Sequence, residues 1–215
     1  MRYPNSLVNI DISKDGYFYI SNTNLHSSND RNLKKLNTNL EEISNENIHL
    51  PDLENQEYFI SKTLESPKSN LYFTLQSGDI VTSGIGMIIL KINNKFIILE
   101  SFVEGSFSNL LIDENEAIYI HYRQGDFYNR PSKGLTLPTR IELPRKVTQF
   151  IFKLDKNEID NYSSLNQEQK EKLMEKNIIG DIPKDFKIYS VNGKKKIIYA
   201  TDKKYIYKIK IGENK

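Results

Sequence analysis

A group of arginine and aromatic residues in the third quarter of the chain has the composition of a binding surface. The group consists of Tyr122, Arg123, Phe127, Tyr128, Arg130, Arg140 and Arg145. Arginine and tyrosine combine large contact areas with hydrogen-bond donors, and they are enriched among the residues that dominate the energy of protein interfaces. The segment therefore predicts a contact with a protein or a peptide. The alternative is a solvated loop without a partner.

A second group of charged residues lies near the C-terminus. It consists of Lys194, Lys195, Lys196, Lys203, Lys204, Lys208 and Lys210, with Asp202 among them. Such a cluster can bind a polyanion, because each lysine can neutralise a phosphate. Lysines on an exposed edge strand also prevent sheets from pairing edge to edge. We favour this second interpretation and predict no specific nucleic-acid partner.

The residue patterns that usually carry catalysis are absent from the sequence. There is no G-x-S-x-G, H-E-x-x-H, Walker A or G-x-G-x-x-G pattern, and there is no cysteine. The three histidines are His26, His49 and His121, and their spacing does not suggest metal ligands. Asp11, Asn109 and Asp113 stand near expected strand ends, where they could converge on a divalent cation. Side chains of this type more often fix turns by bonding the backbone, so we expect no cofactor, no metal and a protein without catalytic activity.

Composition narrows the class of protein further. The chain has 215 residues, a formal net charge of +2 and 38% hydrophobic residues, with 13 Tyr and 10 Phe. This length suffices for one full core, and the balanced charge demands neither a nucleic acid nor an anionic membrane as partner. No apolar run reaches the roughly 20 residues that span a bilayer. Short β-branched and aromatic runs between turn formers predict strands.

Four groups of expected strands divide the chain. They cover residues 7–44, 57–102, 107–160 and 185–212. Asp15-Gly16 predicts a hairpin turn in the first group, and Asn192-Gly193 predicts one in the last. The third group contains the longest irregular segment, residues 124–146. Loops of this length are uncommon unless they are functional or disordered.

A single helix is expected between the third and fourth groups. It covers residues 163–177, with Ser164 as its N-cap and Gln167 three residues later. Its apolar stripe is sparse. We interpret it as an insertion into a chain that otherwise consists of strands.

A recurring pattern links the four groups. The expected second strands carry Tyr19, Tyr72, Tyr119 and Tyr199, spaced by 53, 47 and 80 residues, and the third strands carry Lys35-Leu36, Lys91-Ile92, Lys153-Leu154 and Lys208-Ile209. A period of roughly 45–50 residues built from antiparallel strands is typical of β-propeller blades. We therefore predict one all-β, propeller-like domain over residues 1–215 with about four antiparallel units. A β-sandwich or irregular barrel is the alternative.

Part of this pattern resembles a known family. Residues 11–22, Asp-Ile-Ser-Lys-Asp-Gly-Tyr-Phe-Tyr-Ile-Ser-Asn, and the following Leu33–Asn37 resemble the blade signature of NHL, TolB-like and related six-bladed propellers. In those proteins a D-x-x-G-x-Y-V hairpin leads to a strand that ends in a K-[LIF]-D turn. Residues 112–120 and 152–155 follow the same outline, so the resemblance covers roughly half of the chain. It implies a propeller, although four units are fewer than that family's ring. The chain would then be part of a larger ring, or residues 2–5 would supply a last strand.

The predicted function follows from these observations. We expect a non-catalytic binding or scaffold module that contacts a protein or peptide through blade loops. A homodimer of two half-rings is left open, and so are a metal-dependent propeller hydrolase or lactonase and a polyanion binder. The Lys-, Asn- and Ile-rich composition resembles that of proteins from AT-rich bacteria, and similar propeller-like proteins occur among spirochaete envelope lipoproteins.

That last resemblance implies a bacterial cell envelope or periplasm, with the cytoplasm as the alternative. The N-terminus lacks the apolar region of a signal peptide. Because a strand is expected almost at once, we interpret this start as trimmed or as lying inside a larger architecture. A removed export signal stays open.

Overall fold

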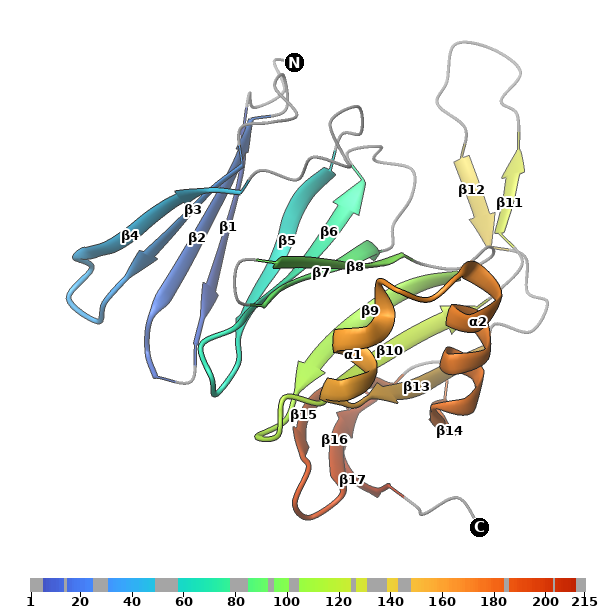
Figure 1. Ribbon diagram of the computed structural model, residues 1–215. Coiled ribbons are helices and arrows are strands. Elements are labelled where there is room, and N and C mark those ends of the chain that lie inside the picture. The colour runs from blue at the N-terminus through green and yellow to red at the C-terminus, as the bar shows by residue number, and fades with distance from the viewer. Residues whose placement is uncertain are drawn as a thin grey trace. The chain divides into compact units, whose positions relative to one another are not determined.

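The computed structural model describes residues 6–13, 15–24, 31–48, 58–77, 85–92, 95–100, 105–124, 127–130, 139–142, 148–183, 186–202 and 204–211. These residues form antiparallel strands and two short helices, which confirms the predicted all-β class. The chain divides into two compact units (Figure 1). The first consists of Met1–Glu65 and Asn70–Phe96, and the second of Ser66–Ser69 and Ile97–Lys215. A single propeller-like domain stays a prediction.

The first unit opens with a four-stranded antiparallel sheet. Its strands are β1 (Ser6–Ile12), β2 (Phe18–Asn24), β3 (Arg31–Leu36) and β4 (Glu42–Asn47), in the order β1-β2-β3-β4. The Asp-Gly hairpin is present, but it has a three-residue loop. Ser13 N donates to Tyr17 O at 2.9 Å, and Gly16 takes a φ of +83°. Glycine adopts this left-handed conformation at little cost.

The rest of the first unit contains β5 (Tyr58–Glu65), β6 (Leu71–Ser77) and β7 (Ile85–Ile92), paired in that order. β8 (Lys95–Glu100) then carries the chain into the second unit. β1 contacts β5 through polar side chains. Asn9 Nδ2 donates to Ser61 O at 2.9 Å, and Asp11 Oδ2 accepts from Thr63 N at 2.6 Å. The alternating strand β1 thus turns its polar face toward β5.

The second unit contains two sheets. The first consists of β9 (Gly105–Ile112), β10 (Ile118–Gln124), β13 (Thr148–Leu154) and β14 (Ile178–Asp181), and the second of β15 (Lys187–Asn192), β16 (Ile197–Thr201) and β17 (Ile206–Lys210). One core cluster joins them. Leu111, Tyr119 and Ile151 come from the first sheet, and Ile188, Ile198 and Ala200 come from the second. Burial of these side chains is the main favourable term that holds the two sheets together.

Two helices, rather than one, separate β13 from β14. They are α1 (Lys156–Tyr162) and α2 (Gln167–Lys176). The predicted Ser164 cap is wrong, because α2 is capped by Asn166, whose side chain accepts from Gln169 N at 2.9 Å. α1 was missed because it starts directly after a strand. Asp155 N donates to Glu158 Oε2 at 2.9 Å, and this bond caps the new helix without any intervening turn sequence.

The segment expected to be irregular, residues 124–146, also contains regular structure. β11 (Phe127–Arg130) and β12 (Thr139–Glu142) pair as an antiparallel hairpin. Prediction failed here because both strands have only four residues and lack the alternation of apolar residues that identifies a strand. We call this hairpin the β11–β12 ribbon.

The recurring Tyr and Lys positions have a shared structural role in three of the four strand groups. The backbone register places Tyr19 opposite Lys35, Tyr119 opposite Lys153, and Tyr199 opposite Lys208. Lys35 Nζ lies 5.4 Å from the Tyr19 ring centroid, and Lys153 Nζ lies 5.9 Å from that of Tyr119. These are cation–π distances. In the remaining group Tyr72 lies opposite Leu90, so the pattern there is shifted by one position.

Candidate binding surface

Tyr122 begins the predicted binding segment, but it is a core residue. Its side chain is 3% exposed, and its ring lies 5.2 Å from that of Phe150 and 6.3 Å from that of Phe152. A side chain at this depth does not contact a partner, so the prediction for Tyr122 is wrong. The period of two in β10 identifies the error. It places Tyr122 on the same face as Ile118 and Ile120, both fully buried.

The β11–β12 ribbon brings together four of the predicted binding residues. Phe127, Tyr128 and Arg130 lie in β11, and Arg140 lies in β12, where its Cα is opposite that of Asn129. Arg123 lies just before the ribbon, in β10, and pairs in register with Gln149. Arg145 falls outside the described residues. Six of the seven predicted residues therefore lie in the ribbon or in β10, which leads into it, and one of these six is the buried Tyr122.

The ribbon is a separate two-stranded sheet. Among the described strands, β11 and β12 pair with each other and with no other strand (Figure 1). A hairpin of two strands is marginally stable by itself. Each of its strands has one edge whose backbone groups take part in no described ladder, and such an edge can accept a further strand. The arrangement suits the capture of an extended peptide.

A buried polar pair lies in the two strands that flank the ribbon in sequence. His121 in β10 and Gln149 in β13 are 2% and 6% exposed, and His121 Nε2 lies 2.9 Å from Gln149 Oε1. The two residues contact each other across neighbouring strands. The described residues contain no group of three or more His, Asp or Glu that could hold a metal ion.

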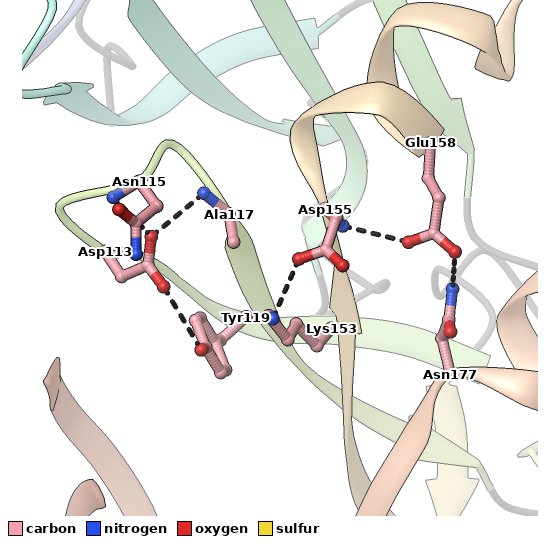
Figure 2. A network of polar contacts seen from close by, with 8 residues as sticks. All are labelled: Asp113, Asn115, Ala117, Tyr119, Lys153, Asp155, Glu158 and Asn177. Carbon is pink, nitrogen blue, oxygen red and sulfur yellow. Dashed lines mark hydrogen bonds and ion pairs between the residues drawn. The ribbon is translucent and has the colours of Figure 1, made fainter. Parts of the chain in front are cut away.

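Asp113 organises the turn between β9 and β10 (Figure 2). Its Oδ1 accepts from Asn115 N at 2.8 Å and from Ala117 N at 3.0 Å, while Oδ2 accepts from the Tyr119 hydroxyl at 3.2 Å. Burial, together with the nearby Asp113 carboxylate, raises the pKa of Tyr119. The turn-fixing role expected for this carboxylate is therefore confirmed.

The other two residues considered for a metal site also bind backbone groups. Asn109 Nδ2 donates to Ile188 O at 2.7 Å and so links β9 to β15. Asp11 accepts from Thr63 N, and burial raises the pKa of Asp11 above its usual value. Each side chain joins a strand to a neighbouring sheet within its own unit.

A second polar chain in Figure 2 ties the helices to the sheet. Lys153 Nζ lies 2.8 Å from Asp155 Oδ1, and Asp155 N donates to Glu158 Oε2. Asn177, at the end of α2, donates to Glu158 Oε1 at 2.9 Å. One carboxylate thus connects the start of α1 with the end of α2, which holds the two helices as a pair beside β13.

The β9–β10 turn also contacts the turns of two neighbouring hairpins. Glu114 accepts from Lys194 N at 2.6 Å and from Gly193 N at 3.3 Å, and Glu116 accepts from Lys68 N at 3.1 Å. Its own backbone N–H and then those of the β15–β16 turn lower the pKa of Glu114. A Cβ on Gly193 would overlap the Asp113 carboxylate, with 2.8 Å to its Cγ. Sequence analysis placed Asp113 near a strand end but did not predict these contacts, because nothing in the local sequence indicates which distant backbone groups Glu114 and Glu116 bond.

The C-terminal lysines lie on the three-stranded sheet. Lys194, Lys195 and Lys196 occupy the β15–β16 turn, while Lys208 and Lys210 are exposed on β17. In the sheet order β15-β16-β17, β17 is an edge strand, as expected. Lys203 falls outside the described residues. The placement fits lysines that protect a sheet edge.

Comparison with known proteins identifies no relative of this chain, since no protein-family model matches it and a search of curated proteins finds no match. Among the described residues, no helix is long and apolar enough to cross a membrane.

Proposed function

We propose that the protein is a non-catalytic binding or scaffold module that captures an extended peptide or protein segment on the β11–β12 ribbon. The observation that carries this proposal is the isolation of the ribbon from every other described sheet. A peptide that adds a strand to a ribbon edge gains backbone hydrogen bonds that the hairpin alone leaves unused. The aromatic and arginine residues of β11 and β12 would then select among peptides.

A metal-dependent propeller hydrolase is the alternative from a different class. It would need oxygen ligands that converge from several strand ends. Asp11, Asn109 and Asp113 instead bond backbone groups of their own units. We therefore rank the binding module first. A bacterial envelope location and an NHL-like or TolB-like propeller ring remain predictions from composition and resemblance.

A random-peptide display library tests the proposal without knowledge of the natural partner. It is screened against the full chain and against a variant in which residues 125–146 are replaced by a short Gly-Ser turn. We expect peptides to be enriched on the full chain and lost on the variant. Enrichment of the same peptides on both, or of none on either, would contradict the proposal.

Two further measurements make that result interpretable. Circular dichroism and hydrogen exchange of β10 and β13 check that the variant keeps its sheet. We expect it to, because the ring contact between Tyr122 and Phe150 involves no residue of the ribbon. Arg140→Ala should weaken the enriched peptides, while Lys172→Ala serves as the matched control. Lys172 is an exposed cation on α2, paired with Glu168.

A further inference from the structure

The first sheet of the first unit exposes an apolar face. We define this outer face by Val8, Ile10, Ile12, Phe18, Ile20 and Leu36. The register places Ile10 opposite Ile20, Ile12 opposite Phe18, and Phe18 opposite Leu36, so these residues adjoin one another across three strands. Val8, Ile10 and Ile12 are 59%, 59% and 66% exposed. Contiguous apolar patches of this kind mark interaction sites.

The opposite face of the same sheet is already occupied. Asn9 and Asp11 bond the backbone of β5, and the Ser21 hydroxyl lies 3.5 Å from Ile60 O. Lys35 Nζ lies 2.9 Å from Glu65 Oε1. The sheet therefore satisfies its polar face within the unit and leaves its apolar face in solvent. This is the reverse of the usual arrangement.

The second unit shows how the equivalent face behaves when it is covered. Ile10, Phe18 and Ile20 correspond to Leu110, Ile118 and Ile120, each 100 residues later in the chain. All three counterparts are fully buried, as are Phe152 and Leu154 on the neighbouring β13. α1 and α2 lie over that sheet in Figure 1 and contribute the buried Ile159, Tyr162 and Met174. In the first unit, a short turn from Asn37 to Glu41 replaces the helical insertion.

We propose that the outer face of β1–β4 is a self-association surface, covered by the same face of a second copy of this chain. Two antiparallel sheets that pack face to face form a sandwich about 10 Å thick. A two-fold axis across the strands, between the row of Ile10, Ile20 and Lys34 and the row of Ile12, Phe18 and Leu36, would place each row against the other row of the second copy. Both partners would then bury the same residues, as a symmetric dimer requires.

The charge of the face permits contact with an identical surface. Among the side chains of this sheet that the structure describes, Lys34 and Glu42 are the charged ones on the outer face, and they form an ion pair at 3.0 Å. The acids Asp15 and Glu41 lie in the two turns at one end of the sheet. An axis across the strands keeps these acidic ends on opposite sides of the dimer. No net like-charge repulsion therefore opposes the contact.

The area of the outer face determines how strong we expect the self-association to be. Strands of six residues are about 20 Å long, and four of them span about 19 Å, which gives a footprint of about 400 Å² per copy. Two copies thus bury about 800 Å², which corresponds to a weak and reversible interface. We expect association that depends on concentration in the micromolar range.

Sedimentation equilibrium of the full chain over a range of micromolar concentrations tests the proposal. We expect a monomer–dimer equilibrium that Ile10→Asp weakens about tenfold or more, because each dimer would bury two unpaired carboxylates. Ile206→Asp is the matched control. Ile206 is 81% exposed on β17 in the other unit, and its replacement should leave the equilibrium unchanged. Circular dichroism checks that both variants are folded.

The absence of cysteine allows a direct test of the geometry. Ile10→Cys should be joined into a dimer by a bismaleimide cross-linker whose spacer reaches about 10 Å, the distance between packed sheets, and Ile206→Cys should not. A chain that is monomeric at all concentrations would overturn the proposal and indicate another cover for this face. A monomer–dimer equilibrium that is unchanged in Ile10→Asp would also overturn it. Loss of association in Ile10→Asp without cross-linking of Ile10→Cys would overturn the two-fold arrangement.

Discussion

The opening sheets of the two units are built on the same plan and differ in what covers them. Both have a three-residue hairpin loop with a left-handed residue, Gly16 in one and Glu116 in the other. In both, an asparagine of the first strand, Asn9 or Asn109, donates to the backbone of the next sheet. The apolar face that follows from this plan is buried in the second unit and exposed in the first.

From this difference we infer that the helical insertion, and not the strands, determines whether the apolar face is buried. The strands of both sheets alternate with the same phase. The second unit adds about two turns of α1 and nearly three of α2 between its third and fourth strands. Glu116, in the turn between β9 and β10, has a left-handed backbone conformation that a contact with a neighbouring hairpin helps to stabilise. A residue other than glycine is strained in this conformation, and its bond to Lys68 N offsets part of the cost.

The largest expected effect comes from trimming equivalent isoleucines on that face. Ile120→Ala should cost about 3–4 kcal/mol, because a fully buried side chain leaves a cavity. Ile20→Ala should cost about 1 kcal/mol, because Ile20 is half-buried. Urea unfolding at low protein concentration, with hydrogen exchange to separate the two sheets, measures both. Equal losses would show that the first unit's face is buried in solution as well.

A smaller effect is expected from the two asparagines that join sheets. Asn109→Ala removes the bond to Ile188 O, and Asn9→Ala removes the bonds to Ser61 O and Asp11. Each loss should cost about 1–2 kcal/mol and should raise hydrogen exchange in its own unit alone. Asn22→Ala is the control, since Asn22 is exposed on β2. An effect that spreads equally to both units would contradict the separate roles of the two bonds.

The smallest effect concerns Glu114 and depends on pH. Because the pKa of Glu114 is lowered in the folded state, its charge stabilises the protein above the usual value of 4.5, and this stabilisation is lost as pH falls through the folded pKa. Glu114→Gln should cost about 0.5–1 kcal/mol at neutral pH, since solvent screens this partly exposed carboxylate. Denaturant unfolding at neutral and acidic pH should show the gap between variant and wild type closing on acidification. A gap that stays constant would rule out the charge as its origin.

The sequence by itself determined the strand content and the repeat. Short β-branched and aromatic runs between turn formers act locally, so the strands, the Asp-Gly hairpin and the recurring Tyr and Lys positions were predictable. α1 and the β11–β12 ribbon were not, since one starts without a turn and the other lacks apolar alternation. Of the predicted binding residues, Tyr122 was misassigned although its own period of two places it with Ile118 and Ile120.

Only the tertiary structure decided which face of a strand is inside. Alternation in β1 separates Val8, Ile10 and Ile12 from Asn9 and Asp11, but the pattern is the same whichever face is covered. In the first unit, the backbone carbonyl and amide groups of β5 bond the polar side chains of β1, so the polar face is the one that lies against β5. In the second unit the inserted helices bury the equivalent apolar side. Which face is covered depends on contacts with residues distant in the chain, and local residue patterns do not predict those contacts.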